Sequence, residues 1–341
     1  MEYKILDMGL PNPAGHSPLR RPGSVRRTTT LDVSWPDGRA GAMWFVGRGR
    51  DILTPRDGGD PVVLREETME ARLGWDRTIQ SISTPKAVNL APLVGERGGG
   101  RLRQVLLDHL PEERRNGTPL YLLLDDISGV SLISGWSWSR WPELMADSLE
   151  GHPMANMSRE ERFQSMASVC IGFRPGSSAL SADRMGPPDQ NNAEVVPLPH
   201  PDDPKGWHQF SEFPSVHMRR ARRIDVWLDD GIAIDAAFQD SGSSPSGRRV
   251  AIHEYKLSAH SDAAGDTLAQ LKAEPRVLPF AECPNAIENI GAVIGSPLRE
   301  LRDRVLQNLG KTMGCTHLND AMRALAETPI LAGELRERMA A

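Results

Sequence analysis

The sequence predicts an α+β protein built from two related halves, each an antiparallel sheet followed by helices. The first observation is that RRTTTLDVSWPDGRAGAMWF, residues 26–45, is matched by RRARRIDVWLDDGIAIDAAF, residues 219–238, at a spacing of 193 positions. Both stretches alternate around an Asp-Gly pair, which is typical of a tight hairpin. The second observation is that apolar residues at helical spacing follow the strands in the later half.

Further matches follow in the same order along the chain. Asp76 corresponds to Asp266, and Gly95 corresponds to Gly295. The stretch YLLLDDI of the first half falls where CTHLNDA stands in the second. Several matches in one order are harder to explain by coincidence than a single match. We therefore predict an internal duplication.

The duplication divides the chain into three predicted parts. Residues 24–145 form a degenerate first copy, and residues 213–330 form the second copy, which carries the cysteines and histidines. Between them, residues 146–212 form a helix and a long, irregular, Pro/Gly-rich linker. The helix is expected to begin at SREE, because this pattern is typical of a capping box.

The elements of the second copy can be assigned in order. RRIDVWLDD and IAIDAAFQDS are the hairpin strands, and RRVAIHEYKLSAHSD is a third strand. Alternation along this strand places His253 and Tyr255 on one side and Glu254 on the other. DTLAQLKAEP is expected to be a short segment that ends in a turn before proline. CPNAIENIGAVIG, PLRELRDRVLQNLG and CTHLNDAMRALAE have the spacing of three helices.

Composition argues against several functional classes. The 341 residues carry a net charge of −5 without a basic stripe, so no nucleic-acid partner is expected. No apolar run approaches the roughly 20 residues that a membrane span needs, and the N-terminal stretch has no features of a signal peptide. Three cysteines, an odd number, argue against a disulfide scaffold. We expect a cytoplasmic protein with free thiols that binds a small-molecule substrate, and the oligomeric state stays open.

A chemical site is expected in the second copy. Cys283 and Cys315 each lie at the predicted first turn of a helix, where the helix dipole and free N–H groups lower the pKa of a thiol. His317 lies two residues after Cys315, and His253 lies on the third strand. These four residues, together with Asp320, are the candidate catalytic residues.

Two kinds of chemistry fit these residues. Cys283, Cys315 and His317 are candidate ligands for zinc or iron. Without a metal, a cysteine thiolate and a histidine would act as nucleophile and base. The alternative is that both cysteines are inert buried residues. Packing alone is the poorer explanation, because the first copy has Tyr121 and Leu123 in place of Cys315 and His317.

Aromatic residues suggest where a flat apolar substrate would bind. Trp136 and Trp138 in WSWSRW alternate as on one face of a strand. Trp207 and His208 lie on the loop before the second copy, where a lid would lie. With Tyr255, these are the candidate substrate-binding residues. The alternatives are core packing for the first pair and a loop anchor for the second.

Several motifs together resemble a known bacterial family. RRARRIDVWLDDGIAIDAAFQDS, HEYKLSA, LPFAECPNAIENIGAVIG and GCTHLNDAMRALAE, with CIGFRPGSS and DPKGWHQF upstream, resemble the family catalogued as domain of unknown function 2889. The resemblance implies a bacterial protein found among genes for steroid or aromatic catabolism. The shape is also similar to iron–sulfur scaffold proteins, but FQDSGSSPSG lacks the cysteine that those proteins have near the first hairpin.

The sequence thus favours an enzyme of bacterial catabolism that acts on an apolar, aromatic or steroid-like metabolite. Lyase, hydrolase and isomerase chemistry all remain open, assisted by a metal or by the Cys/His pair. No nucleotide cofactor is expected, because GERGGGR lacks the context of a phosphate-binding loop. The alternative is a non-enzymatic carrier of a metal or iron–sulfur cluster.

Overall fold

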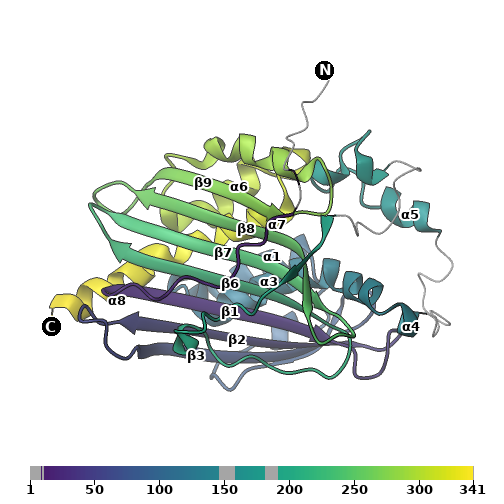
Figure 1. The fold of residues 1–341 in the computed structure, drawn as a ribbon, viewed down its shortest axis with the longest axis horizontal. Helices are drawn as coiled ribbons and strands as arrows, with labels where there is room; N and C mark the ends of the chain where they lie inside the picture. The colour runs from purple at the N-terminus through teal and green to yellow at the C-terminus, as the bar shows by residue number, and fades with distance from the viewer. Residues whose placement is uncertain (1–8, 10, 146–157, 181–190, 341) are drawn as a thin grey trace.

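The computed structural model describes residues 9, 11–145, 158–180 and 191–340. Its nine strands form one antiparallel sheet in the order β4-β3-β2-β1-β6-β7-β8-β5, and β9 also pairs with β8 (Figure 1). The strands are β1 (Ser24–Ser34), β2 (Met43–Thr54), β3 (Val62–Leu73), β4 (Ile79–Ser83), β5 (Ala193–Val195), β6 (His217–Leu228), β7 (Ile232–Ser243), β8 (Arg249–Ser261) and β9 (Leu268–Val277).

Helices α1, α3, α6, α7 and α8 lie on one face of the sheet, behind it in Figure 1, whereas α4 and α5 lie beyond the end of the strands. The α-helices are α1 (Gly100–His109), α2 (Pro111–Arg115), α3 (Pro119–Ile133), α4 (Pro142–Met145), α5 (Arg159–Gln164), α6 (Leu301–Asn308), α7 (Thr316–Arg323) and α8 (Thr328–Ala340). The 3₁₀ segments are η1 (Ala91–Leu93), η2 (Ser134–Arg140), η4 (Ile171–Phe173), η5 (Ser178–Leu180), η8 (Pro204–Gly206), η9 (Cys283–Val293), η10 (Leu298–Glu300), η11 (Lys311–Met313) and η12 (Ala324–Glu327). The α+β class is therefore confirmed.

Strands β1 and β6 join a group of four strands, β1 to β4, and a group of five, β5 to β9, into one sheet. They pair antiparallel over their length, from Ser24 opposite Trp227 to Ser34 opposite His217. At the middle of this pairing, Thr29 lies opposite Arg222, the residue 193 positions later. The internal duplication and its domain boundaries stay predictions, but any second copy shares its sheet with the first.

The core lies between the sheet and the helices. On β7, every second residue from Ile232 to Phe238 is buried against helices α6, α7 and α8. The period of two explains this, because alternate side chains of a strand point to the same face. Each fully buried leucine or phenylalanine there stabilises the fold by roughly 1.5–3 kcal/mol.

Helix α3 packs close to β2 because glycine lies under it. A Cβ atom added to Gly49 would lie 2.7 Å from Pro119 Cβ, at the start of the helix. The helix begins there because Thr118 accepts a hydrogen bond from the Tyr121 amide at 3.2 Å and Pro119 occupies the first position. The same helix carries two aspartates toward the candidate site.

Most elements predicted for residues 213–330 are confirmed, with two corrections there and one in the first half. DTLAQLKAEP is strand β9, and Pro275 is tolerated because it lies beside a bulge opposite Tyr255. CPNAIENIGAVIG forms 3₁₀ turns, not an α-helix. WSWSRW is not a strand, because it continues the end of α3 as the 3₁₀ segment η2.

In the linker, the structure describes residues 158–180 and 191–212, while residues 146–157 and 181–190 lie outside the described part. The predicted capping box is present. The Ser158 amide donates to Glu161 Oε2 at 2.7 Å, and the Glu161 amide donates to Ser158 Oγ at 3.1 Å. Among the described residues, no helix has both the length and the apolar character that a membrane crossing requires.

Candidate metal centre

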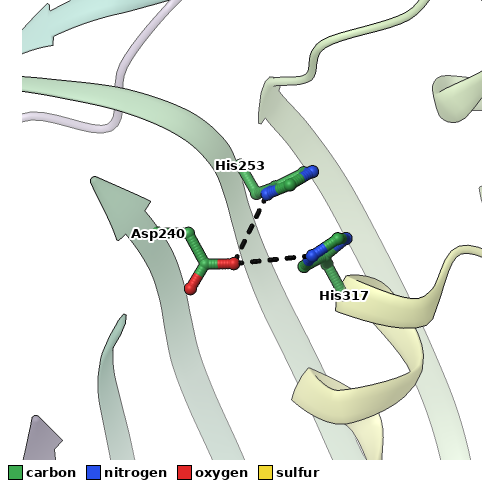
Figure 2. A group of neighbouring side chains, drawn as sticks. All are labelled: Asp240, His253 and His317. Atoms are coloured by element: carbon green, nitrogen blue, oxygen red, sulfur yellow. Dashed lines mark ion pairs between the residues drawn. The ribbon is translucent and has the colours of Figure 1, made fainter. Parts of the chain in front are cut away.

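Asp240, His253 and His317 come together on the helix-covered face of the sheet (Figure 2). Asp240 Oδ2 lies 3.4 Å from His253 Nδ1 and 3.7 Å from His317 Nε2. The two imidazole rings stack, with centroids 3.4 Å apart and an angle of 16° between their planes. Figure 2 shows that both rings face the same carboxylate oxygen.

Three different elements position these side chains. Asp240 of β7 pairs with His253 of β8, and the next pair is Ser241 with Ala251. Ile252 is therefore an extra residue on β8, and such a bulge redirects neighbouring side chains. His317 lies in the first turn of α7, which begins directly over these strands.

Arg220 of β6 fixes the carboxylate from the other side. Its Nε donates to Asp240 Oδ1 at 2.8 Å, and its Nη2 donates to Oδ2 at 3.0 Å. Such a two-point contact between charged groups is strong and sets the plane of the carboxylate. Burial opposes ionisation of Asp240, but Arg220, through its charge and its hydrogen bonds, together with His253 and His317, outweighs it and holds the pKa of Asp240 well below its usual range.

Both histidines are neutral at ordinary pH. Burial lowers the pKa of His253, and burial together with the neighbouring His253 holds the pKa of His317 well below its usual range. Two neutral rings can stack without charge repulsion. Metal binding needs this combination of an ionised carboxylate and neutral imidazoles.

A buried network of charges continues from this site across the whole helix–sheet interface. Asp320 of α7 and Asp126 of α3 both accept from Arg220 Nη1, at 2.9 and 3.2 Å. From Asp320 the network continues as a chain in which each arginine is hydrogen-bonded to the next carboxylate. This chain ends at Asp51 of β2. Among the described residues, the members joined by hydrogen bonds are six arginines and six carboxylates, so their charges balance: Arg27, Arg103, Arg220, Arg222, Arg302 and Arg323 against Asp51, Asp125, Asp126, Asp240, Asp320 and Glu327.

Asp320, a predicted catalytic residue, belongs to this network. It accepts from Arg103 Nη2 at 2.7 Å and from Arg220 at 2.9 Å. Arg220 therefore stands between Asp320 and Asp240. The hydrogen bonds of Asp320 thus reach Asp240 through this guanidinium.

One of the two candidate cysteines, Cys315, lies beside His317. Cys315 directly precedes α7, is 1% exposed, and has its Sγ 3.9 Å from His317 Nδ1. Cys283 opens η9 and is also buried. Tyr255 is fully buried on the same face, and its hydroxyl has no hydrogen-bond partner of normal geometry among the described residues.

The expected lowering of the thiol pKa values is wrong. Burial raises the pKa of Cys315 and holds that of Cys283 well above its ordinary value. Contacts with the Tyr255 hydroxyl and with backbone N–H groups favour the Cys315 thiolate but do not outweigh burial. Without a metal, both thiols are therefore protonated at neutral pH and are poor nucleophiles.

The structure does not gather the tryptophans at this site. Trp207 and His208 lie on the opposite face, where Trp207 donates to Ser17 Oγ at 2.9 Å and His208 bonds two threonines of β1. Both are buried, so they anchor the loop to the sheet. Trp138 stacks edge-on against Trp35. Trp136 comes nearest to the site, because its ring would contact a Cβ atom built on Gly242, which is two residues from Asp240.

The part of the chain that builds the site also has recognisable relatives. Residues 218–331 match the family model described as Protein of unknown function (DUF2889). This confirms the family resemblance of the second copy. Neither the curated proteins nor the solved structures gave a significant match. The DUF2889 segment contains Arg220, Asp240, His253, Cys283, Cys315 and His317, whereas Cys170 lies outside it.

Sequence reasoning missed Asp240 and Arg220. Both are charged residues on a strand face that also carries apolar residues, such as Phe238 and Ile224. Two charges of opposite sign on the buried face of neighbouring strands indicate a pair. This pattern was available in the sequence, although their distance from His317 was not.

Proposed function

We propose that the protein binds one divalent transition-metal ion, zinc or iron, through Asp240, His253 and His317. The observation that carries this proposal is that both imidazoles face one oxygen of a buried, ionised carboxylate. All three ligand atoms lie within 4.8 Å of one another. Two histidines and a carboxylate are a donor set that zinc and iron(II) sites use.

A missing hydrogen bond supports the proposal. His253 Nδ1 is buried and has no hydrogen-bond partner of normal geometry among the described residues. A buried polar atom without a partner is costly, and an ion would satisfy it. Arg220 would then play the role that outer partners have in metal sites, because it orients the ligating carboxylate.

Elemental analysis of protein purified without chelator tests this proposal. We expect His253→Ala and His317→Ala each to lose one equivalent of zinc or iron relative to the wild type. His208→Gln is the matched control, because His208 is a buried histidine on the opposite face. Metal content that is unchanged in both site variants would contradict the proposal.

We further propose that the ion serves catalysis on an apolar, ring-containing metabolite in bacterial catabolism. Three protein ligands leave coordination positions for water or for a substrate carbonyl. The Cys315 thiol lies 3.9 Å from His317 Nδ1 as a group that can move a proton. These features support lyase, hydrolase or isomerase chemistry.

Incubating the metal-loaded protein with aromatic and steroid acyl-CoA thioesters tests this second step. Mass spectrometry and chromatography would detect hydrolysis, addition or loss of water, and isomerisation. We expect turnover that Asp240→Asn abolishes. A protein that binds the metal but turns over none of these compounds would instead be a carrier or accessory protein.

We also propose that the site arose in one copy of a duplicated domain. Asp240 and His317 correspond to Gly47 and Leu123 by the sequence matches. The strand pairing of Asp240 with His253 corresponds to that of Gly47 with Met69. These three residues meet in the first half, because a Cβ on Gly47 would lie 2.6 Å from Met69 Cγ and 3.2 Å from Leu123 Cδ1. An apolar trio thus occupies the place of the metal ligands.

A further inference from the structure

The chain has three cysteines, and the fold brings all of them to one place. Cys170 precedes η4, Cys283 opens η9 and Cys315 precedes α7, and all three are buried. They come from segments far apart in the sequence. Buried cysteines are common as small apolar residues, but packing gives no reason for every thiol of the chain to meet.

Gly172 lets the linker approach the other two cysteines. A Cβ atom on Gly172 would lie 2.9 Å from Cys283 Sγ and 3.8 Å from Cys170 Sγ, so both sulfur atoms border this glycine. The Ile171 amide donates to the Gly314 carbonyl at 2.9 Å, which holds the linker beside Cys315. A side chain at position 172 would separate these thiols.

We infer that Cys170, Cys283 and Cys315 form a second site, for one thiophilic ion such as Zn²⁺. The donor set is separate from that of the proposed Asp240 site, so the inference does not rest on it. Soft thiolate ligands select such ions. Binding transfers three thiol protons to solvent and forms three metal–sulfur bonds, with no change of oxidation state.

The surroundings suit bound thiolates. The buried Tyr255 hydroxyl has no hydrogen-bond partner of normal geometry among the described residues, so it is free to donate to a thiolate formed nearby. The two ring nitrogens of His317 face different partners, Nε2 toward Asp240 and Nδ1 toward Cys315. His317 stays a ligand of the proposed Asp240 site through Nε2, and a water molecule would complete the four-coordination of the sulfur site.

Binding would draw the sulfur atoms together. Among the described residues, the Asp240 group is the one whose ligand atoms all lie within 4.8 Å of one another. The thiols must therefore close around the ion. The ion would then fasten the linker that carries Cys170, which lies outside the DUF2889 segment, to the second copy.

Cobalt titration of the full-length, metal-free protein tests the inference, because Co²⁺ bound to thiolates gives an intense sulfur-to-metal charge-transfer absorption. We expect this absorption in the wild type and in Asp240→Asn, which impairs the first site alone. Cys170→Ser should lower the Co²⁺ affinity at least tenfold or remove the absorption. An absorption that is absent from the wild type, or unchanged in Cys170→Ser, would overturn the inference.

A second measurement uses the wild type alone, in case a cysteine variant fails to fold. Thiol alkylation in mild denaturant, followed by peptide mass spectrometry, reports each cysteine separately. Added Zn²⁺ should protect all three cysteines together, with Cys170 slowed at least tenfold. Protection that spares Cys170 would show that the ion binds elsewhere, and the inference would be wrong.

Discussion

At the scale of single residues, Arg220 decides whether the site can exist. It contacts three buried carboxylates, those of Asp240, Asp320 and Asp126. Carboxylates without a counter-charge in the core would be protonated or would take up water. The same guanidinium therefore stabilises the fold and keeps Asp240 ionised as a metal ligand.

Removing this charge should destabilise the protein strongly. We expect Arg220→Met to lower the free energy of unfolding by about 3–5 kcal/mol, because carboxylates are left buried without a partner. Arg248→Met is the control, since Arg248 forms an exposed pair with Glu194 and its loss should change stability by under about 1 kcal/mol. Urea unfolding measures both, and equal effects would contradict the role of the network.

The network should also make stability depend on acid. Burial opposes ionisation of Asp125, but Arg323, Arg302 and Arg103 outweigh it and hold the pKa of Asp125 below its usual range. A carboxyl group with a depressed folded pKa contributes stability above its unfolded pKa of about 3.9. This contribution is lost as the pH falls from there through the folded value.

Urea unfolding between pH 7 and pH 2 measures this effect. We expect the wild type to lose stability below about pH 4. Asp125→Asn should start less stable and show a shallower acid dependence. Parallel curves for the two proteins would contradict the account of Asp125.

At the scale of elements, the hairpin strands could be predicted from the sequence, and the corrected segments could not. The Asp-Gly turn and the alternation around it locate β6 and β7 because these patterns are local. Strand β9 is different, since its Pro275 is acceptable only beside a bulge that depends on β8. The 3₁₀ turns of η9 keep helical spacing, so periodicity did not separate them from an α-helix.

The candidate site could be predicted in part, because some of its residues follow patterns that are local in the sequence. Alternation placed His253 and Tyr255 on one face, and a helix start placed Cys315 before His317. The bulge at Ile252 and the stacking of two rings depend on tertiary contacts. Burial also reversed the expected pKa shift of the thiols, because the helix start lies inside the core.

The close packing of α3 on β2 gives a prediction at this scale. We expect Gly49→Ala to destabilise the protein by about 1–3 kcal/mol, since the new methyl would overlap Pro119. Gly100→Ala is the control, because a Cβ there meets no atom within 4 Å. In thermal unfolding the control should be neutral or slightly stabilising. A neutral Gly49→Ala would contradict this packing.

At the scale of the whole molecule, the two halves depend on each other. Strand β6 is interior to the sheet only because β1 covers it, and Arg222 is neutralised by Asp126 of the first half. A second half without the first would expose a long strand edge and leave buried arginines unpaired. The match to DUF2889 covers the segment that carries the site, while the first half supplies its supporting charges.

A fragment of residues 158–341 tests this dependence. We expect it to aggregate or to dimerise through β6, because the exposed edge is a template for pairing. Size-exclusion chromatography and circular dichroism measure this. A folded, monomeric fragment with normal metal content would show that the second half is an independent domain and would contradict this view.

The central claim is that Asp240, His253 and His317 hold a metal ion. Anomalous X-ray diffraction from crystals of the metal-loaded protein, at energies on either side of the zinc and iron absorption edges, locates such an ion directly. The account predicts a peak about 2.0–2.2 Å from Asp240 Oδ2, His253 Nδ1 and His317 Nε2. Crystals that contain metal but show no peak at these three atoms would contradict it.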